Sequence, residues 1–279
     1  MPARIESSHM LRQLIDAALA GGREALALYR TDFAVSVKAD KTPVSEADRR
    51  AEAAILACLS CDFRDLAVVA EEAASAGSLP QVGARFFLVD PLDGTKEFIA
   101  RNGEFTVNIA LIEDAEPVAG VVLAPALGRL CVAVEGTAWC ASVNESCTAA
   151  GDLARIRVRP APTVPVGVAS RSHSNPETER VLTAAGVGER RSIGSSLKFC
   201  LLAEGEADFY PRLGPTMEWD TAAGDAVLRS AGGKVVTLDG APLAYGKAAV
   251  SGFRPFENPP FYAVGDAALL ALLGAREPA

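Results

Sequence analysis

The sequence has little that would support a membrane span, a nucleic-acid surface or a secretion signal. No apolar stretch in its 279 residues approaches the ~20 residues needed to cross a bilayer. Acidic residues outnumber basic ones by 35 to 27, giving a formal net charge of −8. This balance argues against binding of a nucleic-acid polymer, which needs a broad basic surface. Because no basic start precedes an apolar run, we expect no signal peptide and a cytoplasmic protein, with peripheral inner-membrane association left open.

Cysteine and histidine are also scarce. The six cysteines are scattered through a chain too long to depend on disulfide bonds. Cys58 and Cys61 form a C-x-x-C pair, but no second pair lies at zinc-binding spacing. We therefore expect packing thiols in a helix, and a reduced setting fits this expectation.

The composition supports a full hydrophobic core, since 49% of the residues are hydrophobic and 22% are charged. Helical and strand-like patterns alternate along the chain, which predicts a layered α/β architecture with mixed sheets. We expect a flexible tail at 1–9, an N-terminal α+β half at 10–155 that binds metal, and a C-terminal α/β half at 156–279 that binds substrate. A cleft is expected between the halves. The main expected elements are helices 10–30, 45–59, 175–185 and 219–233, and strands 65–73, 85–90, 105–114, 117–136 and 164–172, with a turn, a helix and a strand within 190–212.

Carboxylates gather at the expected ends of these elements. Taken singly, each has an ordinary structural explanation: an aspartate opening a helix is an N-cap, an Asp-Gly pair is a turn, and an acid in a first helical turn suits the helix dipole. The residues are Asp48, Glu71 and Glu72, Asp90 and Asp93 within "LVDPLDGTKEF" (88–98), and Asp220 after Trp219.

Together these acids suit Mg²⁺, which prefers hard oxygen ligands. Two such ions ~4 Å apart can stabilise both the attacking and the leaving oxygen of an in-line displacement. We expect Asp90 to bridge two ions, Asp93 to serve one of them, and the Leu92 carbonyl to add a backbone ligand. The N–H groups of Gly94 and Thr95 then offer an anion cradle.

Two motifs carry a family resemblance: D-P-L-D-G-T at 90–95 and W-D-T-A-A-G at 219–224. They resemble the magnesium-dependent, lithium-sensitive phosphatase superfamily that includes the inositol monophosphatases and fructose bisphosphatases. The segments 90–112, 170–173 and 192–216 resemble its bacterial 3'(2'),5'-bisphosphate nucleotidases, and the likeness extends from about Met10 to Pro255. It implies an αβαβα sandwich, two or three Mg²⁺ ions per site, lithium inhibition and removal of the 3'-phosphate of adenosine 3',5'-bisphosphate, giving AMP and phosphate.

The resemblance also implies roles for individual residues. Asp48 would pair with Thr95 to orient the attacking water. A glycine-led turn at 194–198 and Arg212 are reasonable sites for a second anion. His173 is included because the family uses a histidine near the adenosine. The implied metal ligands are Glu71, Asp90, the Leu92 carbonyl, Asp93 and Asp220, and the implied substrate-binding residues are Gly94, Thr95, His173, Ser195, Ser196, Lys198 and Arg212.

Several questions stay open from the sequence alone. Glu218 departs from the family pattern by adding an acid beside Trp219 and Asp220. Inositol monophosphate and fructose 1,6-bisphosphate are rival substrates, although Lys198 and Arg212 favour one with a second anion. A non-catalytic binding protein, and a purely structural role for the acids, are alternatives from other classes. Preference for 3'-phosphoadenosine 5'-phosphosulfate, and the oligomeric state, are not determined.

Overall fold

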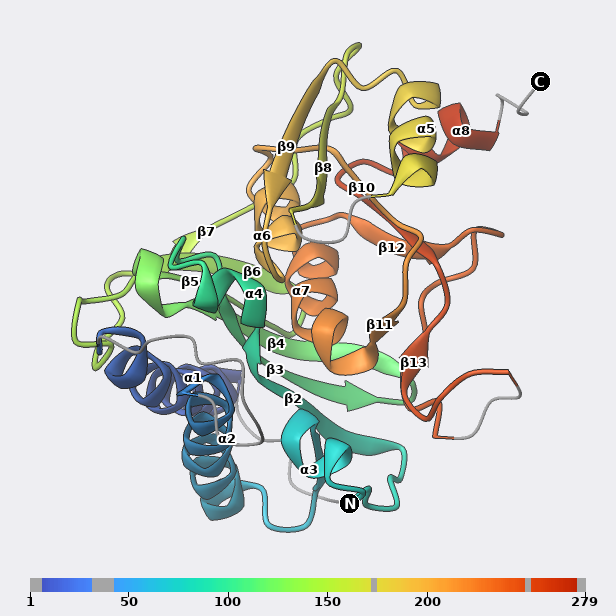
Figure 1. The fold of residues 1–279 in the computed structure, drawn as a ribbon. Coiled ribbons are helices and arrows are strands. Elements are labelled where there is room, and N and C mark those ends of the chain that lie inside the picture. The colour runs from blue at the N-terminus through green and yellow to red at the C-terminus, as the bar shows by residue number, and fades with distance from the viewer. Residues whose placement is uncertain (1–6, 32–42, 172–174, 249–251, 275–279) are drawn as a thin grey trace.

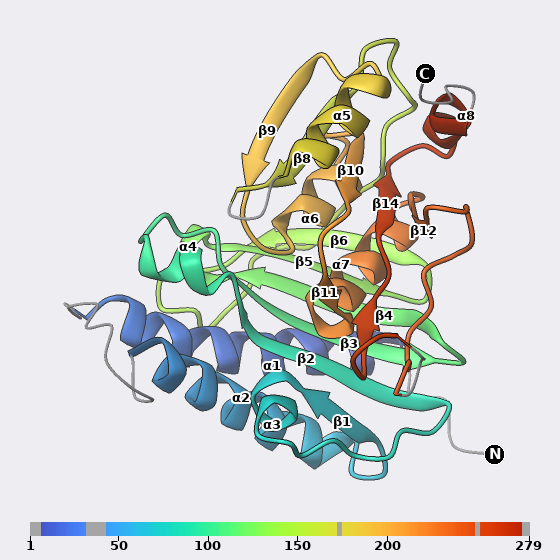
Figure 2. The same ribbon diagram turned by 45° about the vertical axis from the view of Figure 1, so that its right-hand side comes forward.

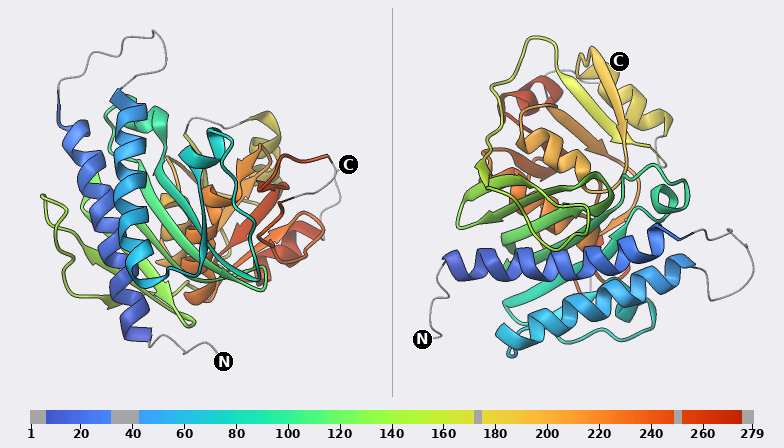
Figure 3. Two further views of the ribbon diagram at one scale, coloured as in Figure 1. Left: turned by 90° about the horizontal axis from the view of Figure 1, so that it is seen from below. Right: turned by 90° about the vertical axis from the view of Figure 1, so that its left-hand side faces the viewer.

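Layers of helices and sheets alternate in the computed structural model, which describes residues 7–31, 43–171, 175–248 and 252–274 (Figure 1). Helices α1 (Ser7–Tyr29) and α2 (Pro43–Asp62) lie side by side on the outer face of the first sheet (Figure 3). Helices α6 (Leu197–Ala203) and α7 (Glu218–Ser230) lie between the two sheets, and α5 (Pro176–Ala184) and α8 (Ala268–Gly274) cover the second sheet (Figure 2). The predicted αβαβα sandwich is confirmed. No helix in these ranges is long and apolar enough to cross a membrane.

The first sheet keeps the order of the chain, whereas the second does not. In the first sheet only β1 and β2 pair in parallel. The seven strands of the first sheet are, in order, β1 (Ala67–Ala70), β2 (Arg85–Asp93), β3 (Thr106–Glu113), β4 (Glu116–Ala124), β5 (Arg129–Val134), β6 (Thr137–Ser142) and β7 (Ala154–Arg155). The second sheet runs β12 (Lys234–Thr237), β14 (Phe261–Val264), β10 (Phe209–Arg212), β8 (Val166–Ser170) and β9 (Glu189–Ile193), and a separate pair joins β11 (Thr216–Met217) to β13 (Glu257–Asn258).

Strand β2 is apolar along its length because both of its faces are covered. Phe87 and Val89 belong to the core under α1 and α2. Phe86 and Leu88 face the opposite way, into the core that contains α6 and α7. A strand buried on both faces has a continuous apolar sequence. Asp90 and Asp93 follow this apolar run at the end of β2, inside the protein.

Small residues let α7 approach the first sheet closely. A Cβ atom on Gly120 of β4 would lie 2.9 Å from the Cβ of Ala226 and 3.0 Å from the backbone of Ala223. On the side of the helix that meets α6, a Cβ atom on Gly224 would lie 2.4 Å from the ring of Phe199. These contacts fix the height of α7 above the sheet, and therefore the position of Asp220 in its first turn.

Three boundaries differ from the sequence prediction. Helix α1 begins at Ser7, so residues 7–9 of the expected tail are helical, and the Nε2 atom of His9 lies 3.8 Å from the Oδ1 atom of Asp62 at the end of α2. Helix α2 begins at Pro43, before the expected start at residue 45, since proline suits a first helical turn. The strand expected at 65–73 ends at Ala70, and α3 (Glu71–Ser75) starts directly after it. His173 lies outside the described residues.

Two of the cysteines form a disulfide, contrary to the expectation of reduced thiols. Cys131 and Cys140 are directly opposite in the register of β5 and β6, with Cα atoms 4.2 Å apart. The pairing depends on this register, which cysteine spacing does not reveal. Of the C-x-x-C pair, Cys58 packs against the core as expected, whereas Cys61 is exposed.

Glu218, the acid that departs from the family pattern, is fully buried at the start of α7. Its Oε2 accepts a hydrogen bond from the Gly246 N–H at 2.6 Å, and its Oε1 accepts one from the Lys247 N–H at 2.9 Å. The Lys247 ammonium lies 2.7 Å from Oε1. The charge of Glu218 is therefore opposed within its own network, which ties residues 246–247 to the helix that carries Asp220.

We expect Glu218→Ala to lower the free energy of unfolding by about 3–5 kcal/mol, because the N–H groups of Gly246 and Lys247 and the part-buried Lys247 ammonium all lose the same carboxylate. Chemical denaturation measures the change. Glu179→Ala is a matched control: it removes an exposed ion pair to Arg190, which typically contributes less than about 1 kcal/mol. Equal losses in the two variants would contradict a stabilising role for the Glu218 network.

Candidate active site

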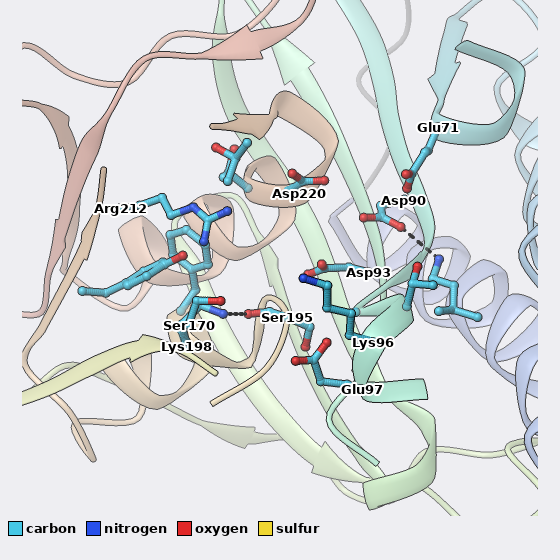
Figure 4. A pocket seen from close by; sticks show the side chains of 17 residues that line it. Glu71, Asp90, Asp93, Lys96, Glu97, Ser170, Ser195, Lys198, Arg212 and Asp220 are labelled. Carbon is cyan, nitrogen blue, oxygen red and sulfur yellow. Dashed lines mark hydrogen bonds between the residues drawn. The ribbon is translucent and has the colours of Figure 1, made fainter. Parts of the chain in front are cut away.

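A cavity of about 290 Å³ lies where the end of β2 meets the first residues of α3, α4 (Thr95–Ile99) and α7. Five carboxylates line it (Figure 4). Four of them, each at the end or the start of an element, are the acids expected to bind metal: Glu71, Asp90, Asp93 and Asp220. The fifth is Glu97 of α4, which the sequence prediction did not include. Two basic side chains lie on the α6 and β10 side of the cavity, and Lys96 of α4 also lines it.

A β-bulge brings Asp90 and Asp93 to the same cavity. Asp90 pairs with Asn108 of β3 and Asp93 pairs with Thr106, so three steps along β2 oppose two along β3. Residues three apart on a regular strand point to opposite faces, and the extra residue corrects this. The Oδ1 atom of Asp90 also accepts a hydrogen bond from the Leu92 N–H at 2.9 Å, which holds the bulge.

A buried acid that sequence reasoning missed positions Glu71. Glu52 of α2 is 7% exposed and accepts hydrogen bonds from the N–H groups of Glu72 (2.9 Å) and Ala73 (3.1 Å). A carboxylate at the start of α3 satisfies N–H groups that have no partner within the helix. Glu71 is therefore held at the first position of α3, beside the end of β2. The position of Glu71 depends on this contact between α2 and α3, which no sequence motif predicts.

Asp220 is not the N-cap of α7 but its third residue. Its Oδ2 atom accepts a hydrogen bond from the Met217 N–H at 2.8 Å, which is one half of a capping box. This bond anchors the side chain at the helix start, where it also lines the cavity. The Asp220 carboxylate therefore both caps α7 and lines the cavity.

A buried hydrogen-bond chain behind these acids joins β3 of the first sheet to the turn before α6 and to α7. The Nδ2 atom of Asn108 donates to the Ser196 hydroxyl at 3.0 Å, and this hydroxyl donates to the Asp220 carbonyl at 2.7 Å. The same amide lies 3.5 Å from the Oδ2 atom of Asp93. Ser196, expected to contact substrate, is 1% exposed and does not line the cavity. Its hydroxyl instead links the elements that carry Asp93 and Asp220.

Burial and mutual repulsion raise the pKa values of the carboxylates. Burial raises the pKa of Glu71 to about 7 and that of Asp220 to about 8. Asp90 is raised well above its ordinary pKa by burial and then by the charges of Glu71, Asp93 and Asp220. Burial also raises the pKa of Asp93, whereas Lys198 acts to lower it. Carboxylates whose charges raise one another's pKa values favour a cation among them.

The donor set fits a hard divalent cation. The charges that most affect the pKa of Asp90 are all negative, and all four acids offer oxygen, the ligand atom that Mg²⁺ prefers. The expected backbone ligand, Leu92, lines the cavity together with Gly94 and Thr95. Gly94 adopts a φ of +97° before α4, a conformation that favours glycine.

Asp48 lies behind this wall and does not line the cavity itself. It is 8% exposed on α2, and burial followed by the charges of Glu72, Glu71 and Glu52 raises its pKa to about 8. The structure thus places Asp48 beside Glu71.

Lys198 is the buried cation of the site. Its side chain is 4% exposed, and its ammonium donates to the carbonyls of Ser195 and of Ile193, the latter at 3.3 Å. Burial lowers its pKa to about 8, against the opposing effect of Asp93. Its ammonium also lies 5.3 Å from the ring centre of Tyr210. Figure 4 shows Lys198 on the side of the cavity opposite Glu71.

Two further expected substrate residues carry buried polar atoms without a partner among the described residues. Arg212 donates from one amino group to the Pro215 carbonyl at 2.9 Å, while its Nε has no acceptor. The Ser195 hydroxyl is likewise buried and unpaired, on a backbone with a φ of +48°. Both residues line the cavity. Unpaired polar atoms in a cavity wall fit a polar ligand, because leaving them unsatisfied is unfavourable.

Curated relatives match nearly the whole chain. The 3'(2'),5'-bisphosphate nucleotidase CysQ of Escherichia coli (strain K12) is 46% identical over 238 residues, covering 85% of this chain and 94% of that protein. The protein of the same name from Buchnera aphidicola is 40% identical over 256 residues, covering 91% and 93%.

Solved structures and a family profile agree with these relatives. The crystal structure of CysQ from Bacteroides thetaiotaomicron, described as a bacterial member of the inositol monophosphatase family, has a TM-score of 0.78 at 39% identity and covers 93% of this chain and 98% of that one. An inositol monophosphatase from Zymomonas mobilis shares the fold, with a TM-score of 0.77 at 24% identity and coverage of 98% and 99%. The profile described as the inositol monophosphatase family matches residues 6–255. The chain belongs to the inositol monophosphatase family.

Proposed function

We propose that the protein is a magnesium-dependent phosphomonoesterase that removes the 3'-phosphate of adenosine 3',5'-bisphosphate, giving AMP and phosphate. The observation that carries the proposal is the cavity in which the four acids expected to bind metal face Lys198 and Arg212. The acids suit cations that bind a phosphate, and the basic side chains suit an anionic substrate. The nucleotidase names of the relatives agree with this chemistry.

Glu71, Asp90, Asp93, Asp220 and the Leu92 carbonyl would hold the two or three magnesium ions that the family resemblance implies. Bound there, the ions supply charge stabilisation for an in-line displacement at phosphorus. The raised pKa values of these carboxylates show that their ionised forms are unfavourable without a cation.

The remaining steps use the chain's own groups. The Thr95 hydroxyl, which lines the cavity, and the Asp48 carboxylate would together orient a water for attack on the 3'-phosphorus. The bond from the water oxygen to phosphorus forms as the bond to the 3'-oxygen breaks, and the proton that the water gives up ends on the departing 3'-oxygen. Lys198 and Arg212 hold anionic groups of the substrate on the far side of the cavity. Ser196 and Asn108 act as positioning residues, because their hydrogen bonds fix the separation of Asp93 from Asp220.

Phosphate release from a panel of four substrates tests the proposed activity. The panel contains adenosine 3',5'-bisphosphate, 3'-phosphoadenosine 5'-phosphosulfate, inositol 1-phosphate and fructose 1,6-bisphosphate, each assayed with magnesium and again with added lithium. We expect preference for the adenosine compounds and loss of release with lithium. Preference for inositol or fructose phosphate would overturn the substrate assignment, and no release at all would favour a binding protein.

Asp93→Asn is expected to lower kcat/KM by at least ~100-fold, since it removes a charged ligand from the metal site. Without magnesium the same variant is expected to unfold at a temperature no lower than wild type, because one repelling buried charge is gone. Steady-state kinetics and thermal unfolding measure the two effects. Asp239→Asn, at an exposed turn, is the matched control and should change neither. Undiminished turnover in Asp93→Asn would refute the ligand assignment.

Magnesium affinity is expected to increase with pH between about pH 6 and about pH 9. The metal binds ionised carboxylates, whereas burial holds the metal-free pKa values of Glu71 at about 7 and Asp220 at about 8. Protons must therefore leave on binding below these pKa values, and the dependence should level off above them. Calorimetric titration in buffers of different ionisation enthalpy counts the released protons. An affinity that does not change over this range would argue against cation binding by these carboxylates.

A further inference from the structure

A second cavity, of about 510 Å³, adjoins the first. The two share three lining residues, namely Arg212, Thr216 and Asp220. Asp220 is the only acid in the wall of the second cavity among the described residues, and its carboxylate already belongs to the metal site. The second cavity adds one basic side chain of its own, Arg254, which neither the sequence motifs nor the family resemblance singled out.

We propose that the second cavity extends the subsite for the non-reacting part of the substrate, and that Arg254 joins Arg212 in binding the second anionic group there. This inference rests on the proposed function, because it takes the first cavity as the place of the phosphate that is removed. The ligand class it predicts is a small molecule with two anionic groups separated by a spacer. Adenosine 3',5'-bisphosphate belongs to this class.

The backbone N–H and the Nε atom of Arg254 are bonded to Glu257, which leaves the two terminal amino groups of its guanidinium for a ligand. Its Nε lies 3.1 Å from the Oε2 atom of Glu257, and its backbone N–H donates to the same oxygen at 3.0 Å. Within the described ranges, its two terminal amino groups have no recorded partner, and the side chain is 68% exposed. Two adjacent amino groups of a guanidinium match two phosphate oxygens, which is the geometry of a bidentate contact.

The segment that carries Arg254 is anchored to the start of α7. Strand β13 pairs with β11, so Glu257 lies opposite Met217 in the register. Asn258 donates to the Met217 carbonyl at 2.8 Å and to the Thr221 hydroxyl at 3.0 Å. Arg254 is therefore placed by the same helix start that places Asp220, which reduces the conformational entropy lost when a ligand binds.

Arg212 lies between the two cavities. Its bond to the Pro215 carbonyl holds one amino group, while the buried Nε lacks an acceptor. The adjoining wall of the second cavity includes Pro215 and Met217, whose apolar surfaces suit a sugar or a base better than a charge. A molecule that spans both cavities would pass Arg212 and end at Arg254. A monophosphate of the same size would leave Arg254 without a partner.

The test compares two nucleotides that differ only in the second anion, adenosine 3',5'-bisphosphate and adenosine 3'-monophosphate. The measured quantity is the ratio of their kcat/KM values, in magnesium, for wild type and for Arg254→Ala. Because the variant loses a charge-assisted hydrogen bond to the second anion, we expect this ratio to fall ~10-fold, or about 1.4 kcal/mol, through KM for the bisphosphate. Arg254→Lys should recover part of the ratio, since it keeps the charge and loses the fork.

Arg190→Ala is the matched control, because Arg190 is an arginine of similar ion pairing, to Glu179, on the edge strand β9. It should keep the wild-type ratio. A bisphosphate preference that Arg254→Ala retains would overturn this inference and leave the proposed function standing. Equal losses for both nucleotides would show a structural effect and also overturn it. Failure of the wild-type protein to release phosphate from either nucleotide would overturn the proposed function itself, and this inference with it.

Discussion

The placing of four carboxylates around one cavity is the constraint on which the rest of the site depends. Burial is the largest cause of the raised pKa values of Glu71, Asp90, Asp93 and Asp220, and for all but Asp93 the charges of the other acids add to it. Such an arrangement is unfavourable in a protein without cations, so the surrounding structure has to hold it.

Three separate devices hold these acids. The bulge in β2 brings two of them to one face, Glu52 fixes the start of α3, and the capping bond at Met217 fixes Asp220. Close contact of α7 with Gly120 then sets the distance between the strand and the helix. The same rigid core that provides stability therefore provides the geometry of the site.

The site could be predicted from the sequence where its residues lie in one continuous motif. The turn at 90–95 and the start of α7 carry their acids in recognisable strings, and the fold followed from the family resemblance. Residues that act across elements could not be found this way. No recognisable motif marks Glu52, Asn108 or Arg254. The position of each relative to the site depends on packing between segments that are far apart in the chain.

Ser196 shows the reverse error. Its neighbours on a glycine-led turn suggested a contact with substrate, and Ser195 and Lys198 do line the cavity. The intervening backbone turns Ser196 inward, where its hydroxyl joins Asn108 to Asp220. Similarly, the partner of Cys131 depends on the register of a hairpin. In both cases the direction of a side chain decided the outcome, and residue type alone does not give it.

The acids and the residues of the second cavity lie on different kinds of element, and this has an evolutionary consequence. The acids lie on a sheet strand and at helix starts held by the core, whereas Thr216 and Arg254 lie in the short segments around β11 and β13. Side-chain changes at Thr216 and Arg254 would alter the wall of the second cavity while the backbone bond from Met217 to Asp220 stays in place. One catalytic centre can thus be inherited unchanged while lineages diverge in substrate, as mutations accumulate first where the core tolerates them.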